Sequence, residues 1–374
     1  MHPSAALLAA LTMTTAFAAE SIVYVGTYTT KQSKGIYAFR FNDADGKMTP
    51  LGLMAETPSP SFLAFHPSGK FLYAVNEIDE FQGAKAGSVT AFLIDRKTGK
   101  LTQLNAVSTK GTGPCHLSVD ATGKTLLIAN YGGGSIASYG IDATGHLSEA
   151  VSFIQHTGSS IDKRRQGEPH AHSINVDPTN SFAVVADLGL DKVFFYKLDA
   201  AHHTLSPTPQ MSVSTNPGAG PRHFAFHPNG KYGYVINEMQ STISMLSLGA
   251  NPKLGTSITT LPAGYQSLST STAEVRVHPS GKFLYGSNRG HNSIASFAVD
   301  PTNGTLKALG HTPVQGKTPR NFTLDPTGKF LLVANQDSDN LVLFQTEADG
   351  HLKSTGTVFE VSMPVCVRFL PPLK

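Results

Sequence analysis

Six residues of the types that serve in acid–base catalysis and anion binding stand at related places along the chain. They are His170, His172, Arg222, Glu238, Arg289 and Arg320. Guanidinium groups bind carboxylates and phosphates through paired hydrogen bonds, and an imidazole or carboxylate can take a proton from water. If folding gathers the six, three arginines facing one acid would form a pocket for an anionic or oxygen-rich ligand. The alternative is a lattice of ion pairs that ties neighbouring elements together.

A repeated β-hairpin would have to position these residues. Its clearest copy is residues 220–238, GPRHFAFHPNGKYGYVINE. Aromatic and aliphatic residues recur there at the two-residue period of a strand, on both sides of the turn at residues 227–231. Gly230 in that turn is free to take a positive φ. The pattern predicts two short antiparallel strands joined by a tight turn.

The hairpin recurs along almost the whole chain. Its turns open at His66, Asp120, Asp177, His227, His278 and Asp325. A period of about 50 residues is typical of a repeat architecture. Two more strand-like runs follow each hairpin, as at residues 134–142 and 145–148 in the second copy. Four antiparallel strands per repeat make the blade of a β-propeller.

The two ends of the chain supply one further blade. Residues 364–370 read as a first strand, and residues 21–27, 35–41 and 46–51 supply the other three. Closing the ring in this way removes the exposed sheet edges. We therefore predict an all-β fold, a seven-bladed β-propeller of four antiparallel strands per blade, as a single domain over residues 20–374.

Hairpin geometry converts the repeat into a predicted site. The start of the first strand and the end of the second lie at the same end of a hairpin, and propellers turn the first strand toward the central channel. The residue five places before each turn should therefore line one mouth. These residues are Ser61, Cys115, His172, Arg222, Ala273 and Arg320.

The second strand of each hairpin ends on a recurring polar residue. These are Asn76, Asn130, Asp187, Asn237, Asn288 and Asn335. A side chain shared by all copies is expected to satisfy backbone groups at the strand end, as is the His or Asp that opens each turn. The next residue varies and is free to carry function; it includes Glu238, Arg289 and Gln336.

Residues beside this ring receive other assignments. His116 and His223 come one place later in the strand, so they should alternate to its other face and pack there. Arg165 lies in a long loop between blades two and three, numbered in chain order. Its charge would either be solvated or form part of a lid over the pocket.

Composition and charge limit the class of protein. The chain has 374 residues, of which 40% are hydrophobic and 15% charged, with 35 glycines. This is typical of a turn-rich folded chain. A formal net charge of +3 does not indicate nucleic-acid binding. Cys115 and Cys366 should be separated by a whole blade, beyond the reach of a disulfide, so we expect two free buried thiols.

Residues 1–19 are predicted to be a signal peptide. The stretch 5–18 is apolar and too short to span a bilayer, and Ala16-Phe17-Ala18 fits a cleavage site. The mature protein would then be periplasmic or secreted.

Several of these residues resemble a known family. Residues 165–172, RQGEPHAH, together with GPRH at 220–223 and Asn237-Glu238, resemble the seven-bladed lactonase family, which includes bacterial 6-phosphogluconolactonase and fungal carboxymuconate cyclase. Residues 24–28, YVGTY, are similar to the start of those proteins. The resemblance spans essentially the whole mature chain. It implies that His172, Arg222, Glu238 and Arg289 serve the active site without a metal.

The predicted reaction is hydrolysis of a sugar δ-lactone, such as glucono-1,5-lactone or its 6-phosphate. Glu238 or His172 would deprotonate the attacking water, and Arg222 would hold the developing oxyanion. The remaining residues would bind the substrate: His170, Arg289, Arg320, Arg165 and Gln336. The chain has no G-x-S-x-G elbow, which disfavours an acyl-enzyme. We expect no cofactor, no nucleic-acid or membrane partner, and a monomer or weak homodimer.

Three alternatives remain open at this point. The same cationic pocket could serve a lactonising cycloisomerase that acts on a carboxymuconate. A non-enzymatic periplasmic binding propeller would instead present an apolar patch at the mouth. A metal-dependent lactonase would need oxygen ligands, which Glu77 and the ring of Asn side chains could supply.

Overall fold

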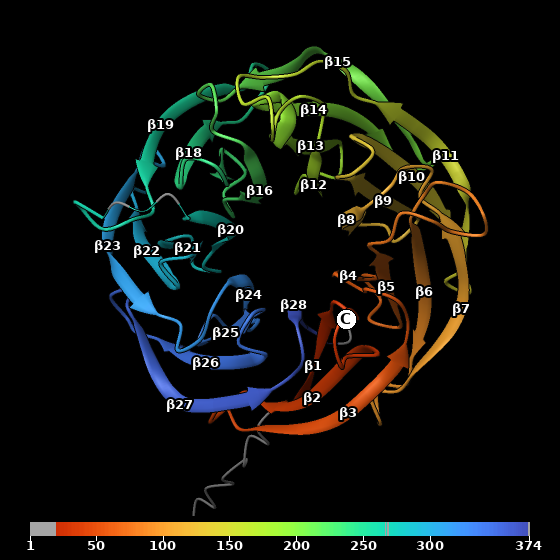
Figure 1. The fold of residues 1–374 in the computed structure, drawn as a ribbon, viewed down its shortest axis with the longest axis horizontal. Helices are drawn as coiled ribbons and strands as arrows, with labels where there is room; N and C mark the ends of the chain where they lie inside the picture. The colour runs from red at the N-terminus through yellow and green to blue at the C-terminus, as the bar shows by residue number, and fades with distance from the viewer. Residues whose placement is uncertain (1–19, 266, 268, 373–374) are drawn as a thin grey trace, which may run out of the picture.

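The computed structural model describes residues 20–265, 267 and 269–372. Its strands form seven four-stranded antiparallel sheets set radially around a central axis (Figure 1). This arrangement confirms the predicted seven-bladed β-propeller. The predicted signal peptide lies outside the described residues. Within those residues, no helix has the length and apolarity needed to cross a membrane.

The first three blades follow one another along the chain. Blade one contains β4 (Phe62–Phe65), β5 (Phe71–Asn76), β6 (Ser88–Ile94) and β7 (Leu101–Ser108). Blade two contains β8 (Pro114–Val119), β9 (Thr125–Asn130), β10 (Ser135–Ile141) and β11 (Leu147–Gln155). Blade three contains β12 (Ala171–Val176), β13 (Phe182–Asp187), the 3₁₀ turn η1 (Leu188–Leu190), β14 (Lys192–Asp199) and β15 (Thr204–Ser214).

Three further blades repeat this order. Blade four contains β16 (Pro221–Phe226), β17 (Tyr232–Asn237), β18 (Thr242–Ser247) and β19 (Lys253–Thr259). Blade five contains β20 (Ser271–Val277), β21 (Phe283–Arg289), β22 (Ser293–Val299) and β23 (Leu306–Pro313). Blade six contains β24 (Pro319–Leu324), β25 (Phe330–Asn335), β26 (Asn340–Thr346) and β27 (Leu352–Glu360).

Blade seven joins the two ends of the chain, as predicted. It contains β28 (Pro364–Phe369), β1 (Glu20–Thr27), β2 (Gly35–Asn42) and β3 (Met48–Glu56), in that spatial order. Strand β28 pairs antiparallel with β1, with Val25 opposite Val367. The C-terminal strand therefore closes the ring by lying innermost in a blade whose other strands come from the start of the chain.

The innermost strands carry a β-bulge near their start. In β16 the register shifts between Pro221 and His223, which leaves Arg222 without a partner on β17. The same shift leaves three other residues unpaired: Cys115 in β8, His172 in β12 and Arg320 in β24. A bulge bends the strand and re-aims the extra side chain, and bulges are common beside active sites.

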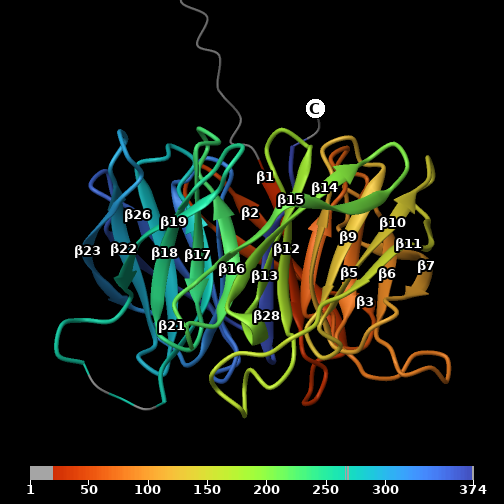
Figure 2. The same cartoon turned by 90° about the horizontal axis from the view of Figure 1, so that it is seen from above.

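The mouth at which the innermost strands begin also carries the longest connections. These are residues 77–87 and 156–170 and the described part of the connection between β19 and β20, at the lower edge of Figure 2. The hairpin turns, the start of β1 and the end of β28 lie on the opposite face. Long loops over a rigid scaffold are a common setting for binding and catalysis.

The blades pack on one another through apolar faces with one repeated polar tie. The Tyr234 ring is fully buried, and its hydroxyl donates to the Gly304 carbonyl in an outer turn of the next blade, at 2.8 Å. The same bond joins three more pairs: Tyr24 with Gly99, Tyr73 with Gly145, and Tyr285 with Gly350. These ties hold neighbouring blades, and so the mouth, in a fixed arrangement.

Candidate active site

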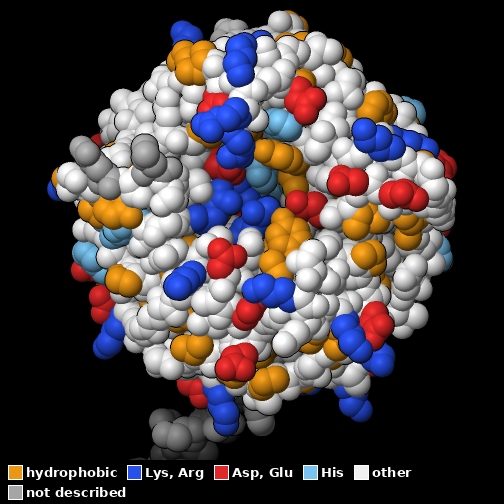
Figure 3. Space-filling model, in the orientation of Figure 1, with side chains coloured by type: hydrophobic (Ala, Val, Ile, Leu, Met, Phe, Trp, Pro, Cys, Tyr) orange, Lys and Arg blue, Asp and Glu red, His pale blue; other side chains and the backbone are white. Residues whose placement is uncertain are grey.

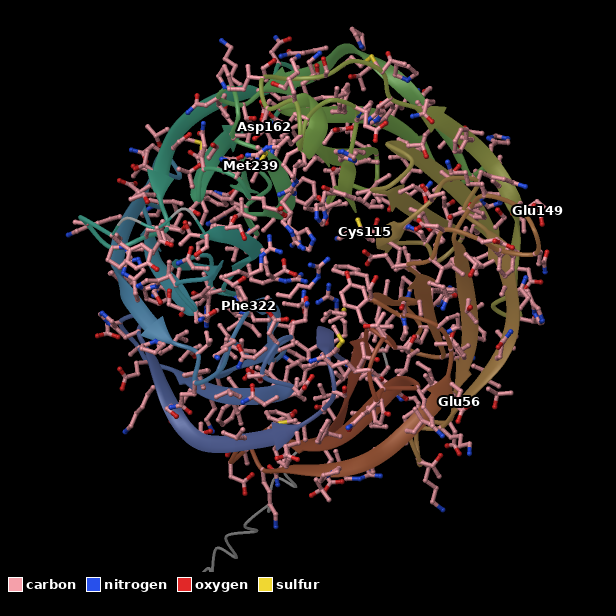
Figure 4. The ribbon with its side chains drawn as sticks, viewed as in Figure 1. Glu56, Cys115, Glu149, Asp162, Met239 and Phe322 are labelled. Atoms are coloured by element: carbon pink, nitrogen blue, oxygen red, sulfur yellow. The ribbon has the colours of Figure 1, made fainter. Side chains whose placement is uncertain are left out.

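Two rings of side chains line the mouth, and they form a cup. The inner ring comes from the strand starts: Ser61, Cys115, His172, Arg222, Ala273 and Arg320. The outer ring stands at the ends of the second strands, on the last residue or the one after it: Tyr28, Glu77, Tyr131, Leu188, Glu238, Arg289 and Gln336. Figure 3 shows this face hollowed at its centre, with Lys or Arg side chains inside the hollow. In Figure 4, Cys115 lies beside the central opening, on the inner side of blade two.

Glu238 lies at the centre of the predicted cluster. Its Oε1 atom is 2.6 Å from Arg165 Nη2. Its Oε2 atom is 3.0 Å from Arg222 Nε and 3.0 Å from Arg289 Nη2. The same oxygen is 3.8 Å from His172 Nε2. One buried carboxylate therefore gathers three guanidiniums and an imidazole that come from three blades and a long loop.

These charges set the protonation of the cluster. Burial alone would raise the pKa of Glu238, but Arg289 and Arg222, with His172 and Arg165, hold it well below its usual range. Burial lowers the pKa of Arg222 to about 10, and Arg289 and Arg320 add to this effect. At neutral pH the carboxylate is thus ionised and Arg222 is still a cation.

His172 is buried and neutral. Burial, reinforced by the nearby Arg222, holds its pKa well below 6.5. Its Nε2 atom faces Glu238, and its Nδ1 atom is 3.5 Å from Cys115 Sγ. Burial raises the pKa of the Cys115 thiol, which therefore remains protonated. A neutral imidazole keeps a nitrogen lone pair that can accept a proton.

Arg320 occupies another part of the cup. Its Nη2 atom donates to the Tyr28 hydroxyl at 2.7 Å, and its guanidinium lies 5.2 Å from the centre of the Tyr28 ring. The Tyr28 hydroxyl in turn lies 3.0 Å from each carboxylate oxygen of Glu77. Arg320 also interacts electrostatically with Glu238, so this second group belongs to the same cup.

His170 and Arg165 meet at Tyr131. The His170 ring stacks on the Tyr131 ring, with 4.5 Å between their centres and 13° between their planes. Arg165 Nη2 lies 3.3 Å from the Tyr131 hydroxyl as well as beside Glu238. The Arg165 side chain is 44% exposed, so the loop at residues 156–170 reaches over the mouth from outside.

A layer of buried side chains closes the cup below. The Phe62 ring from blade one lies 5.7 Å from the His223 ring of blade four and 4.1 Å from the His116 ring. His223 Nδ1 is 3.2 Å from Glu274 Oε1. Both histidines are buried, as predicted, but their predicted alternation away from the channel is wrong. Because of the bulges, His116 and His223 lie in the channel below His172. The centres of the His172 and His223 rings are 5.5 Å apart.

The ring of strand-end amides has a structural role. Asn76, Asn130, Asn288 and Asn335 each donate to a backbone carbonyl. The residues that open the turns act similarly: the Asp120 carboxylate accepts from three backbone N–H groups. Both cysteines are free and buried, as expected.

Gln336 stands apart from the cluster. It belongs to the outer ring, but its amide donates to Asp337 at 3.1 Å, and within the described part of the chain none of its hydrogen bonds reaches the other predicted residues. Tyr28 and Tyr131 contact the site and were not predicted for it. Tyr131 occupies the variable position after the strand-end amide, which was the available signal. Tyr28 occupies it too, but Thr27 replaces the amide there.

No group of three His, Cys, Asp or Glu side chains placed as metal ligands occurs among the described residues. Glu77, the carboxylate of the metal-dependent alternative, instead accepts from Tyr28. The mouth is lined by charged groups, whereas a binding platform would call for an apolar patch there.

Comparisons with known proteins agree with this geometry. The family model for "Lactonase, 7-bladed beta-propeller" matches residues 22–369. A 6-phosphogluconolactonase of Bacillus subtilis is 36% identical over 355 residues, covering 93% of this chain and 98% of that protein. One of Formosa agariphila is 38% identical over 337 residues, covering 87% and 93%. The solved structure of a periplasmic gluconolactonase of Pseudomonas aeruginosa superposes with a TM-score of 0.88 at 33% identity, covering 94% of this chain and 99% of that one. The chain therefore belongs to the seven-bladed β-propeller lactonase family.

Proposed function

We propose that the cup hydrolyses a sugar δ-lactone, such as glucono-1,5-lactone or its 6-phosphate, to the aldonic acid. The observation that carries the proposal is the placement of Glu238, which holds Arg165, Arg222 and Arg289 within 3.0 Å beside the neutral His172. Water attack on a lactone needs a proton acceptor and a cation for the developing oxyanion. This cluster supplies both in one buried place.

His172 is the proposed proton acceptor. When it takes a proton from water, the imidazolium that forms faces Glu238 Oε2 across 3.8 Å. This attraction exists only once the proton has moved, so it stabilises the transition state more than the ground state. Glu238 itself is a weak base because its pKa is held so low. Its role is to position the arginines and to stabilise the charged imidazole.

Arg222, with Arg289, is proposed to hold the carbonyl oxygen as it becomes an oxyanion. A donor of this kind contributes up to about 3 kcal/mol to catalysis. Water adds to the carbonyl carbon and gives one proton to His172. The ring C–O bond then breaks, the ring oxygen takes up a proton, and the product is a hydroxy acid. All atoms of the lactone and of one water are retained in it.

The excess of cations supports an anionic or oxygen-rich ligand. Four guanidiniums, of Arg165, Arg222, Arg289 and Arg320, face the two carboxylates of Glu238 and Glu77. Arg289 Nε is buried and has no hydrogen-bond partner among the residues that the structure describes. A small movement toward a ligand oxygen would satisfy that donor, which is costly to leave unpaired.

The same excess also supports a second reaction, in which a carboxylate adds across a muconate to form a lactone. The two proposals differ in the ligand that binds best. A tricarboxylate that raises the melting temperature of the protein far more than glucono-1,5-lactone does would favour cyclisation. A lactone or aldonate that stabilises it more would favour hydrolysis.

We further propose that the protein acts in the periplasm. The predicted signal peptide supports this, as does the likeness to a protein described as a periplasmic gluconolactonase. Phosphorylated sugars are scarce outside the cytoplasm, so this location favours glucono-1,5-lactone over its 6-phosphate.

A pH-stat assay tests the proposed function. Protein that begins at Glu20 is mixed with each lactone, and acid release above the spontaneous rate is recorded. Wild-type protein should turn over at least one of the two, and His172→Gln should lower kcat by about 10² to 10⁴. His202→Gln is the matched control, because the His202 side chain is 78% exposed in the turn between β14 and β15, where it pairs with Asp199. Equal rates for the two variants would contradict the role given to His172.

A further inference from the structure

Tyr28 is held in a fixed orientation in the wall of the cup. Its hydroxyl accepts from Arg320 Nη2 at 2.7 Å and donates toward Glu77, whose oxygens are each 3.0 Å away. Its backbone N–H donates to the Met363 carbonyl at 3.1 Å. Side chain and backbone are thus both restrained, as expected of a group whose position matters.

Tyr28 and His172 come from opposite sides of the ring of blades. Tyr28 belongs to blade seven and His172 to blade three, so three or four blade steps separate them around a ring of seven. The channel is narrow, because Phe62 of blade one touches His223 of blade four just below. A small ligand above this floor would have His172 on one side and Tyr28 on the other.

Lactone hydrolysis includes a second proton transfer, to the leaving group, whose donor the mechanism above does not name. The leaving group is the ring oxygen, an alkoxide whose conjugate acid is about as weak an acid as water. Its departure becomes easy when a proton reaches it as the bond breaks. His172, once protonated, can return its proton only to a leaving group within its reach, so a ring oxygen on the opposite side of the cup calls for a second donor.

Tyr28 meets the requirements of that donor. Burial raises its pKa, and Glu77 adds to this, so the phenol carries its proton at neutral pH. Rotation of the O–H bond away from Glu77 would aim the proton into the cup. The phenolate left behind would face Arg320, which already lies within hydrogen-bond distance. Arg320 itself does not give up a proton at neutral pH, since its pKa is raised by Tyr28 and Glu77 despite burial.

We propose that Tyr28 is a catalytic acid that protonates the leaving ring oxygen, with Arg320 and Glu77 as its positioning residues. The inference rests on the proposed lactone hydrolysis. The O–H bond of Tyr28 breaks, the ring oxygen gains that proton, and the C–O bonding pair stays on the oxygen. His172 then releases its proton to solvent, and the phenolate regains one from solvent, which restores both groups.

The test compares two leaving groups on the same sugar. Glucono-1,5-lactone expels an alkoxide, whereas glucono-1,5-thiolactone expels a thiolate, which is a far weaker base and needs no proton to depart. Tyr28→Phe removes only the hydroxyl. It should lower kcat on the lactone by about 10² or more, but on the thiolactone by less than about tenfold. Tyr232→Phe is the matched control, because the Tyr232 hydroxyl donates to Thr302 outside the cup.

Each outcome has one meaning. Equal losses on both substrates, or no loss on the lactone, would overturn the acid role of Tyr28. A wild-type protein that hydrolyses neither substrate would instead refute the proposed function. Should Tyr28→Phe fail to fold, Arg320→Gln serves in its place, because it removes the stabiliser of the phenolate. It should show the same selective loss of kcat on the lactone, and an unselective loss would contradict the proposal.

Discussion

At the scale of single residues, one acid determines the arrangement of the cup. Glu238 is in contact with Arg165, Arg222 and Arg289, and these contacts could by themselves be read as a lattice that ties blades together. Two observations favour a site. Arg165 reaches Glu238 from an exposed loop, and the neutral His172 is placed where an acquired proton would be stabilised. A purely structural lattice requires neither.

The protonation of His172 predicts the pH dependence of the reaction. The base must be unprotonated, so activity is present above the pKa of His172 and is lost as the pH falls through it. Because burial holds that pKa well below 6.5, kcat/KM should stay constant from about pH 8 to below 6.5 and fall only in more acidic solution. The measurement is kcat/KM against pH, corrected for spontaneous hydrolysis. A midpoint at or above 6.5 would show that His172 is not the base in this state.

Removing the charge of Glu238 should lower the stability of the protein as well as its catalytic activity. Glu238→Gln removes the carboxylate charge that contacts the buried guanidiniums of Arg222 and Arg289. Loss of one partner of a buried pair costs about 3 to 5 kcal/mol. Urea unfolding measures this loss, with Glu149→Gln as the control because that side chain is 74% exposed. Equal urea midpoints for Glu238→Gln and Glu149→Gln would contradict this prediction, because they would mean that water already screens the charges of the cluster.

At the scale of elements, the sequence predicts the blades but not the bulges in their innermost strands. Turn residues and a regular period are local signals, so the blades and the mouth could be predicted from them. A bulge depends on the pairing between two strands, which local alternation does not reveal. Simple alternation along the strand therefore places His116 and His223 on the wrong side. The long reach of Arg165 to Glu238 depends on the path of the loop at residues 156–170, which has no repeat to align it.

Blade seven shows a second limit of the repeat. In the other blades an amide or carboxylate marks the end of the second strand, and the residue after it faces the cup. Thr27 stands at that place in β1, and its hydroxyl donates to the Gly35 carbonyl. The repeat therefore does not indicate that the neighbouring Tyr28 belongs to the outer ring. Its contacts with Arg320 and Glu77 place it there.

The hairpin turns should affect stability without affecting catalysis. Asp120 is fully buried and accepts from the backbone N–H groups of Thr122, Lys124 and Thr125. In Asp120→Ala these donors lose their acceptor, which costs about 1 to 3 kcal/mol for each buried group left unpaired. The melting temperature should fall while kcat stays unchanged, since the turns lie on the face opposite the cup. Asp45→Ala, at an exposed turn, should have a much smaller effect. A fall in kcat at a temperature where Asp120→Ala is folded would contradict this separation.

At the scale of the whole molecule, the site exists only when the ring is closed. All seven blades contribute side chains to the cup, and β28 closes the ring by pairing with β1 in blade seven. A chain that ends after Glu360 lacks β28 and leaves β1 with an open edge. It should lose cooperative unfolding and lactone hydrolysis together. A chain that ends after Leu370 keeps the strand and should retain both. Circular dichroism and the pH-stat assay give the two readouts, and an active protein without β28 would contradict the requirement for closure.

The closed ring also offers a competing cavity. An apolar groove of about 520 Å³ lies between blades three and four on the face of the hairpin turns. Its walls include Phe182, Phe195 and Leu248, and it contains none of the cup residues. A sugar lactone, rich in hydroxyl groups, suits the charged cup, whereas this groove suits an apolar ligand.

The most direct test of the account is a crystal structure of the protein with glucono-δ-lactam, in which an amide nitrogen replaces the ring oxygen and resists hydrolysis. The account predicts that the lactam lies in the cup, with its carbonyl oxygen toward Arg222 and Arg289, its carbonyl carbon beside His172, and its ring nitrogen toward Tyr28. A lactam bound in the groove between blades three and four, or bound in the cup with its carbonyl turned away from both arginines, would contradict it.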